Sequence, residues 1–488
     1  MPLNRPRRLP RALIFAVVGM LMITSHAQSA DDRESGSAAE PFPSLTLQSM
    51  EPQSVGQPFV LPGLLTTGGG KSSESGIALT GFQSACDDCD ACATGGCCSA
   101  CGGCCNSCLC PLPTAPCQDC PRISTQSPYF NINVFGALKL DMLFNEARPI
   151  SPGTPFFLSP KSNMGFDEQT FDAHARQSML GASLVGPQFG GFQSGGTAMA
   201  VFYNDAIIVD QYGFLPLQAY GELKNSDWRF SAGLQFDVFA PGAPTVLPFS
   251  VLNASGNAGN SFRGQVRLER FLQTSADRQW TLQLALSEPI SSTIDPSFRL
   301  AEDNGWPNVE GRVALGCGGL DATTGRRPFE FGLSGVLGQL RTTILNTAQH
   351  VTDVWGLNAD FYWKINDTFG FTGEVFTGEA IGIYNAGIFQ GINKATFDGI
   401  RTSGGWIESF VYWTPCLHSH LGFGVDDPRD SDVDPVGRLK NETYFANLIW
   451  DVNSTFRIGG ELAWRETDYN LLSDNEGIGF HTQFQWTF

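Results

Sequence analysis

The last twelve residues of the chain alternate between apolar and polar positions. The apolar phase holds Ile478, Phe480, Phe484, Trp486 and Phe488. The polar phase holds His481, Gln483, Gln485 and Thr487. Because successive side chains of a β-strand point to opposite faces, residues 477–488 are predicted to form a strand with one apolar and one polar face.

The same period of two begins at about residue 129 and continues to the end of the chain. It predicts sixteen strands, at residues 131–145, 172–187, 192–204, 215–225, 228–239, 261–274, 279–289, 308–318, 327–342, 350–365, 369–381, 402–414, 417–425, 440–451, 455–469 and 477–488. Short links such as 366–368 follow the even-numbered strands, and longer links such as 240–260 follow the odd-numbered ones. Strict alternation of this kind predicts short turns at one rim of a barrel and long loops at the other.

Tryptophans support the same arrangement. Five of them lie near a predicted short turn and on the apolar phase of their strand: Trp228, Trp280, Trp363, Trp413 and Trp450. Such a row is typical of an aromatic girdle at a membrane interface, whereas a soluble β-sandwich would bury these rings against a second sheet. The predicted fold is therefore all-β: a transmembrane antiparallel β-barrel of about 16 strands, behind a disordered and Cys-rich N-terminal extension.

Composition excludes other classes of protein. Hydrophobic residues make up only 42% of the chain and its mean hydropathy is -0.08. Beyond the N-terminus no run approaches the roughly 18 apolar residues of a spanning helix, so a membrane location requires a closed barrel. A net charge of -18 argues against nucleic acid as a partner.

The N-terminal region is predicted to contain three segments. Residues 1–27 resemble a signal peptide, with arginines before the apolar run 12–23 and a small-x-small cleavage site at 25–27; the alternative is a retained anchor helix, for which the run is too short. Residues 28–85 are rich in Ser, Gly and Pro and are predicted to form a flexible linker. The barrel is assigned to residues 129–488.

Residues 86–120 form a Cys-rich segment that has little apolar surface to bury. It holds twelve of the fourteen cysteines: Cys86, Cys89, Cys92, Cys97, Cys98, Cys101, Cys104, Cys105, Cys108, Cys110, Cys117 and Cys120. Structure here would have to come from cross-links or metal. Export to an oxidising compartment favours disulfides, while repeated C-x-x-C spacing also suits zinc or an iron–sulfur cluster. Intermolecular cross-linking or thiol chemistry is a third possibility.

A barrel of this size is too wide for side chains to fill, so its inward-facing residues are the candidates for a pore lining. The inward phase holds Lys139, Asp141, Glu222, Arg229, Asp237, Arg263, Arg267, Arg312, Asp360, Arg457, Glu461 and Arg465. Facing rows of opposite charge would set a transverse field that favours polar solutes. The alternative is that these charges pair as structural salt bridges. Arg263 and Arg267, with their neighbour Glu269, are the preferred functional group.

Two features carry a resemblance to known families. Phe488 on a terminal alternating strand resembles the signal by which outer-membrane barrels are handed to their assembly machinery. The segment 135–141 (FGALKLD), the long first loop and the run 261–263 (SFR) resemble DcaP-like porins. Members of that family carry a coiled-coil N-terminal extension, where this chain has the Cys-rich segment. Residues 129–488 as a whole resemble general trimeric porins of the Gram-negative outer membrane.

This resemblance implies a homotrimer in the outer membrane, in contact with its lipid, that passes small polar solutes by passive diffusion. It also implies that the third long loop, 241–260, folds into the lumen; a surface loop and a contact between protomers are the alternatives. The N-terminal arm is expected in the periplasm, with a possible cell-wall partner. A competing interpretation is a structural or adhesive barrel that this arm anchors.

No cofactor or metal ligand set is predicted for the barrel. No G-x-S-x-G or H-E-x-x-H motif and no phosphate-cradling loop occurs in the sequence, so the chain is not predicted to be an enzyme. An outer-membrane hydrolase remains the enzymatic alternative.

Overall fold

A computed structural model describes residues 124–126, 130–161, 168–204, 211–259, 261–289, 306–321, 326–344 and 348–488. The predicted signal peptide, linker and Cys-rich segment lie outside these residues. In the described ranges, no helix has the length and apolar character that would be needed to cross a membrane.

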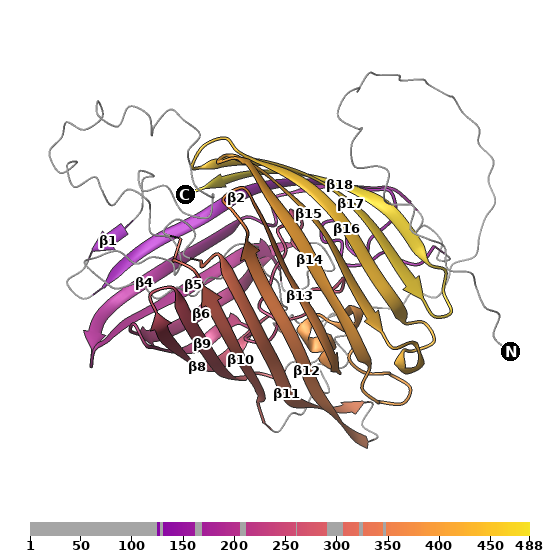
Figure 1. Ribbon diagram of the computed structural model, residues 1–488. Helices are drawn as coiled ribbons and strands as arrows, with labels where there is room; N and C mark the ends of the chain where they lie inside the picture. Colours follow the sequence, from indigo (N-terminus) through magenta and orange to yellow (C-terminus); the bar gives the residue numbers. More distant parts are fainter. Residues whose placement is uncertain are drawn as a thin grey trace. The chain divides into compact units, whose positions relative to one another are not determined.

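The described part of the chain is built almost entirely of antiparallel strands (Figure 1). Their bounds are β1 Ser124–Gln126, β2 Asn131–Asn145, β3 Thr170–His174, β4 Met179–Phe189, β5 Phe192–Tyr203, β6 Tyr212–Lys224, β7 Trp228–Phe236, β8 Phe262–Ser275, β9 Arg278–Ser287, β10 Asn308–Cys317, β11 Phe329–Ile344, β12 Ala348–Lys364, β13 Phe369–Glu379, β14 Arg401–Thr414, β15 Leu417–Pro428, β16 Arg438–Asp451, β17 Phe456–Tyr469 and β18 Asn475–Thr487. Three short 3-10 helices lie between strands: η4 Ile381–Tyr384, η5 Gly387–Phe389 and η6 Asp430–Asp432.

Consecutive strands pair with one another around the whole circuit, and the last strand returns to the first. β18 pairs with β2, with Phe480 opposite Phe144, so the sheet closes into a barrel. β3 and β4 both pair with β2 and together make one interrupted barrel strand. β1 pairs with residues 131–133 at the start of β2, a part of β2 that β18 does not cover. The predicted closed barrel of sixteen strands is confirmed.

The seam of this barrel depends on the C-terminal residue. The Phe488 amide donates to the Gly136 carbonyl at 3.1 Å, and the Gly136 amide donates to the Phe488 carbonyl at 3.0 Å. The Phe488 ring lies over Gly136 so closely that a Cβ there would come within 2.6 Å of Cζ. The terminal residue therefore completes the ladder between the two ends of the sheet.

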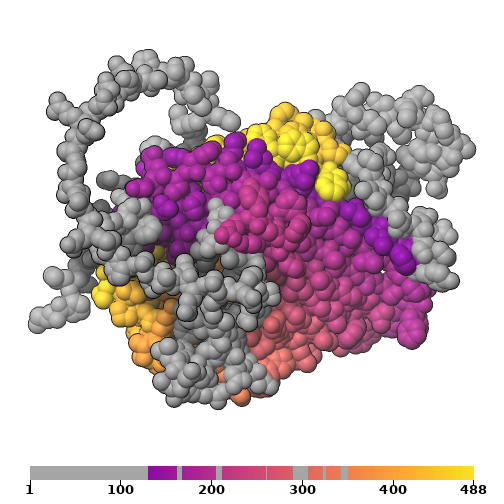
Figure 2. Space-filling model, turned by 180° about the vertical axis from the view of Figure 1, so that it is seen from behind, coloured from indigo at the N-terminus to yellow at the C-terminus, as the bar shows by residue number. Residues whose placement is uncertain are grey.

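The two faces of the wall have the predicted polarity. Apolar side chains of one phase are exposed on the outside, such as Leu138 (52%), Leu357 (60%) and Leu462 (55%), whereas Asp141 and Glu461 of the other phase are buried inside. The five tryptophans near the short turns are all exposed, as predicted. Figure 2 shows the broad outer surface that the strands of the first half of the barrel form.

Two connections differ from the predicted strict alternation of short and long links. β11 and β12 stay paired out to Ile344 and Ala348, so the long loop expected between them shrinks to three residues. The β-branched residues of this hairpin favour continued strand pairing beyond the apolar band. At the opposite rim, the link between β10 and β11 covers residues 318–328 and is longer than a tight turn.

Candidate functional site

The long connection between β7 and β8, residues 237–261, folds into the barrel. Its side chains Val246, Leu247, Phe249 and Val251 are at most 5% exposed. Val246, Phe249 and Val251 pack in one cluster with inward-facing aromatic residues of distant strands, including Trp406 of β14 and Phe445 of β16. We call this segment the inward loop. Of the three alternatives open from the sequence, the inward position is the one observed.

Four carboxylates on four different strands bind the backbone of the inward loop. Oε2 of Glu310 on β10 accepts from the Val238 amide at 2.7 Å. Glu374 on β13, Glu408 on β14 and Glu461 on β17 accept from the amides of Gly242, Thr245 and Leu247 at 3.1, 2.6 and 2.9 Å. Each carboxyl oxygen satisfies a backbone amide that would otherwise be buried without a partner. The loop is thus held in a line across the inside of the wall by side chains of the barrel.

Amide side chains hold the carbonyl groups of the same loop. Asn447 Nδ2 donates to the Thr245 carbonyl at 2.7 Å, and Asn441 Nδ2 donates to the Ala254 carbonyl at 2.7 Å. Asn385, from the connection between β13 and β14, donates to the Gly259 carbonyl at 2.7 Å. A buried loop must satisfy its backbone groups because each unpaired one costs about as much as a lost hydrogen bond. These contacts explain how the polar backbone of this segment can lie inside the barrel.

A second connection, residues 380–400 with η4 and η5, packs against the inward loop. The Tyr384 hydroxyl donates to Glu310 Oε1 at 3.1 Å, and the Ile388 amide donates to Asp426 Oδ2 at 3.0 Å. Among the residues that the structure describes, nine non-glycine residues have a positive φ, and all nine lie in these two connections: Ala240, Val251, Leu252, Ala254, Ala380, Asn385, Ile388, Phe389 and Phe397. Such φ values are locally unfavourable, so tertiary contacts must maintain this conformation.

An acidic connection near η6 supports this second segment from outside the strands. Asp432 accepts two hydrogen bonds from the Arg401 guanidinium, at 2.7 and 2.9 Å, and these hold the pKa of the Asp432 carboxyl below its usual range. Asp434 accepts from the Lys394 amide at 3.0 Å. The carboxylates therefore serve as local anchors. Within the ranges that the structure describes, no group of three or more His, Cys, Asp or Glu residues could hold a metal ion.

Most of the predicted pore-lining charges lie in ion pairs inside the barrel. Arg229 bonds to Glu222 at 2.6 Å and to Glu269 at 2.7 Å. The other pairs are Arg263 with Asp237 at 2.7 Å, Arg312 with Asp360 at 2.6 Å and Arg457 with Asp451 at 2.7 Å. Lys139, Asp141, Arg267, Glu461 and Arg465 are also in the interior, each less than 10% exposed.

Arg263 and Arg267, which with Glu269 form the group preferred from the sequence, lie where the inward loop joins the barrel wall. Arg263 is 1% exposed and donates from Nε to Asp237, from Nη1 to the Glu288 carbonyl at 3.2 Å and from Nη2 to the Ile383 carbonyl at 2.8 Å. Arg267 donates to the Phe236 carbonyl, and its guanidinium lies 3.8 Å from Glu269. These contacts brace the point where the loop leaves the wall.

Several interior residues were not selected from the sequence. Glu374, Glu408 and Asp426 lie on the inward phase of β13, β14 and β15, so their phase alone would have placed them inside. Their partners could not be found in this way, because each binds a backbone amide of a distant connection. His418 and His420 share the inward phase of β15, but which groups they contact depends on the register of the neighbouring strands.

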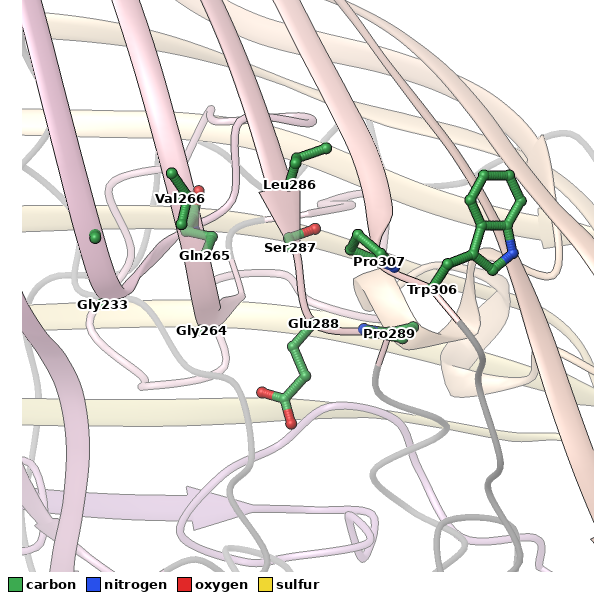
Figure 3. A pocket seen from close by; sticks show the side chains of 11 residues that line it. Gly233, Gly264, Gln265, Val266, Leu286, Ser287, Glu288, Pro289, Trp306 and Pro307 are labelled. Carbon is green, nitrogen blue, oxygen red and sulfur yellow. The ribbon is translucent and has the colours of Figure 1, made fainter.

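A hollow lies at the ends of β7, β8 and β9, near the rim of the long connections (Figure 3). Gly233 and Gly264 leave space there, and Val266, Leu286 and Trp306 line it. Val266 and Leu286 belong to the exposed outward phase.

A closed sixteen-stranded barrel, apolar outside, polar inside and narrowed by an inward loop, is the architecture of outer-membrane porins. The resemblance noted from the sequence is thus confirmed at the level of the fold. The chain is similar to the outer membrane channel DcaP of Acinetobacter baumannii, with 14% sequence identity, a TM-score of 0.60 and coverage of 75% of this chain and 99% of that one.

Two other solved structures are similar to the chain at lower TM-scores. The anion-selective porin from Comamonas acidovorans is 11% identical, with a TM-score of 0.48 and coverage of 74% of this chain and 100% of that one. OprB of Pseudomonas putida is 8% identical, with a TM-score of 0.45 and coverage of 74% and 94%. No protein-family model matches the chain, and no curated protein matches its sequence.

Proposed function

We propose that this protein is an outer-membrane channel through which small polar solutes diffuse passively. The observation that carries the proposal is the polarity of the wall. Exposed apolar side chains cover its outside, while charged and amide side chains fill its inward phase. This arrangement is the one expected of a barrel whose outside contacts lipid and whose inside contacts water.

The charged side chains inside the barrel fall into two groups that suggest where the water lies. The loop anchors Glu310, Glu374 and Glu408 are at most 1% exposed. The side chains of the pairs Arg229 with Glu222 and Arg312 with Asp360, and that of Arg457, keep between 10% and 17% of their surface exposed. We assign the second group to the lining of the aqueous passage, where rows of opposite charge favour polar solutes over apolar ones. The inward loop would narrow this passage.

The outer membrane is the proposed location, with the short links at the periplasmic rim and the tryptophans above them at the interface. A homotrimer follows from the resemblance to porins. The N-terminal arm, with its cysteines in disulfides, would then hang in the periplasm and could engage a cell-wall partner. Phe488 would serve as the assembly signal in addition to closing the seam.

The proposal is tested by single-channel recording in a planar bilayer, with the full chain and with a variant that lacks residues 28–125. Stable conductance steps in both would establish an open pore with an accessory arm. Steps that occur only after truncation would make the arm a plug. If neither protein conducted, the channel proposal would fail and the barrel would be a scaffold.

A further inference from the structure

Two buried histidines on β15 form a continuous chain with a carboxylate at each end. Nδ1 of His420 lies 2.5 Å from Glu408 Oε1 on β14, and Nε2 of His420 lies 2.8 Å from Nδ1 of His418. At the far end, Nε2 of His418 lies 3.4 Å from Asp451 Oδ2 on β16. All four side chains are at most 5% exposed. The three strands are neighbours in the wall (Figure 1).

The chain has three contacts, and each contact needs one proton. A neutral imidazole carries a single N–H, so two neutral rings supply two protons. If His420 donates to Glu408 and His418 donates to His420, the lone pair of His418 Nε2 is left facing the carboxylate of Asp451. The opposite assignment moves the same deficit to the Glu408 contact. With both carboxylates ionised, only a pair that carries one additional proton can fill all three contacts.

The geometry locates the missing proton. The first two contacts have the lengths of hydrogen bonds, but 3.4 Å is longer than an ordinary N–H···O bond. His418 Nε2 and Asp451 Oδ2 are both buried without a hydrogen-bond partner. We propose that the His418–His420 pair is a proton-binding site. It takes up one proton and thereby strengthens the hydrogen bonds that hold the inward loop.

Two routes couple His420 to the inward loop, one through its ring and one through its backbone amide. Glu408, which binds His420 through Oε1, accepts the Thr245 amide through Oε2 at 2.6 Å. The His420 amide donates to Asn447 Oδ1 at 3.2 Å, and Asn447 Nδ2 donates to the Thr245 carbonyl at 2.7 Å. His420 is therefore linked to the amide and to the carbonyl of one loop residue. A movement of His420 is therefore expected to change the hydrogen bonds of Thr245.

The carboxylates at the two ends of the pair favour the added proton, while burial and the nearby Arg457 cation oppose it. Glu408 of β14 and Asp451 of β16 cap the chain, and Glu461 of β17 lies one contact further on, bonded to Asn447. The cation facing this group is Arg457 of β17, whose Nε donates to Asp451 Oδ1 at 2.7 Å. Tyr412 of β14 stacks on the His418 ring at 5.1 Å. One proton on the imidazole pair places a cation between two carboxylates and completes the hydrogen bond at Asp451.

The proton site is tested by nuclear magnetic resonance of the full chain, labelled with 15N-histidine in detergent micelles. We expect the two rings to take up one shared proton in a single step between about pH 5 and 8, the range in which histidine titrates. The variants His418→Gln and His420→Gln assign the signals, and each should abolish the shared step. His481→Gln, which alters a histidine bonded to Asp141 instead, should leave the step intact. Two rings that titrate independently, or that stay neutral over this range, would overturn the proposal.

The coupling is measured by hydrogen exchange of the peptide 241–250, corrected for the intrinsic effect of pH on exchange. One additional hydrogen bond is worth about 1 kcal/mol, so protection should fall roughly fivefold between about pH 6 and about pH 9 in the wild-type protein. His418→Gln should remove this difference, and His481→Gln should keep it. Equal protection at both pH values in the wild type would refute the coupling.

The consequence for solute flow rests on the proposed channel function, and it is tested separately. Current fluctuations in the bilayer should become more frequent at the higher pH in the wild type but not in His418→Gln. If the protein did not conduct, the channel proposal would fail, and the exchange experiment would still decide the proton site and its coupling. If it conducted with the same pH dependence in His418→Gln, the link from the pair to the channel would be wrong.

Discussion

Replacing Glu310 by alanine should release the first residues of the inward loop without opening the barrel. Glu310 is fully buried and accepts four hydrogen bonds: from the amides of Val238 and Phe239 at 2.7 and 3.1 Å, from the Ser287 hydroxyl at 2.5 Å and from the Tyr384 hydroxyl at 3.1 Å. Hydroxyls can turn to other acceptors, but the two amides are fixed by the backbone. Each buried amide that loses its partner costs about 1–3 kcal/mol.

The expected loss is therefore about 2–6 kcal/mol for the seated state of the loop, reduced by whatever the loop regains through contact with water. The paired strands do not depend on Glu310, so the barrel should stay closed. Glu310→Gln should have an intermediate effect, because its amide nitrogen would face donors while its oxygen still accepts. The resulting order of loop protection is wild type, Glu310→Gln, Glu310→Ala.

Hydrogen exchange of residues 237–245 measures the loop, and resistance of the folded band to sodium dodecyl sulfate at room temperature measures the barrel. Glu330→Ala on β11 is the matched control, because Glu330 pairs with Arg326 at 3.5 Å and does not hold the loop. Unchanged exchange in Glu310→Ala would refute the role of the carboxylates as loop anchors. Loss of the folded band in the same variant would show that the loop and the wall fold as one unit.

Four further predictions follow from other contacts. Gly136→Val should prevent closure of the seam, since a Cβ there lies 2.6 Å from the Phe488 ring and 2.7 Å from the Met179 carbonyl. The folded band on a gel should then be lost. The control Gly460→Val should keep the folded band, because nothing lies within 4 Å of a Cβ at that position. Arg263→Met should destabilise the protein by about 3–5 kcal/mol, because it leaves Asp237 buried without its cation; a thermal midpoint equal to that of the wild type would contradict this. The pair of Asp432 with Arg401 should stabilise its connection above the unfolded carboxyl pKa of about 3.9 and lose this effect as the pH falls through the lowered folded value; Asp432→Asn should remove the acid-dependent rise in hydrogen exchange there. Peptide mapping without reductant should find the twelve cysteines of residues 86–120 in disulfides, and free thiols throughout would remove that proposal.

The period-two pattern was sufficient for the wall of the barrel. In β2, Leu138 and Asp141 point to opposite sides because adjacent side chains of a strand must do so, and no knowledge of the partner strands is needed. The same local rule placed all sixteen strands and the inward phase of the charges. It failed at β11 and β12, where strand pairing continues past the apolar band, because pairing depends on the partner strand as well as on the pattern.

The path of the inward loop could be decided only by the tertiary structure. Residues 241–260 carry no charge and no regular period, and a resemblance to porins was the one argument for their position. Their amides are bound by Glu374, Glu408 and Glu461, which lie more than a hundred residues away in the chain. The same holds for the proton chain, since Glu408, His420 and Asp451 come together through the register of three strands. A sequence pattern determines which way a side chain points, because that depends on neighbours in the chain. Which buried donor meets which acceptor depends on closure of the whole barrel.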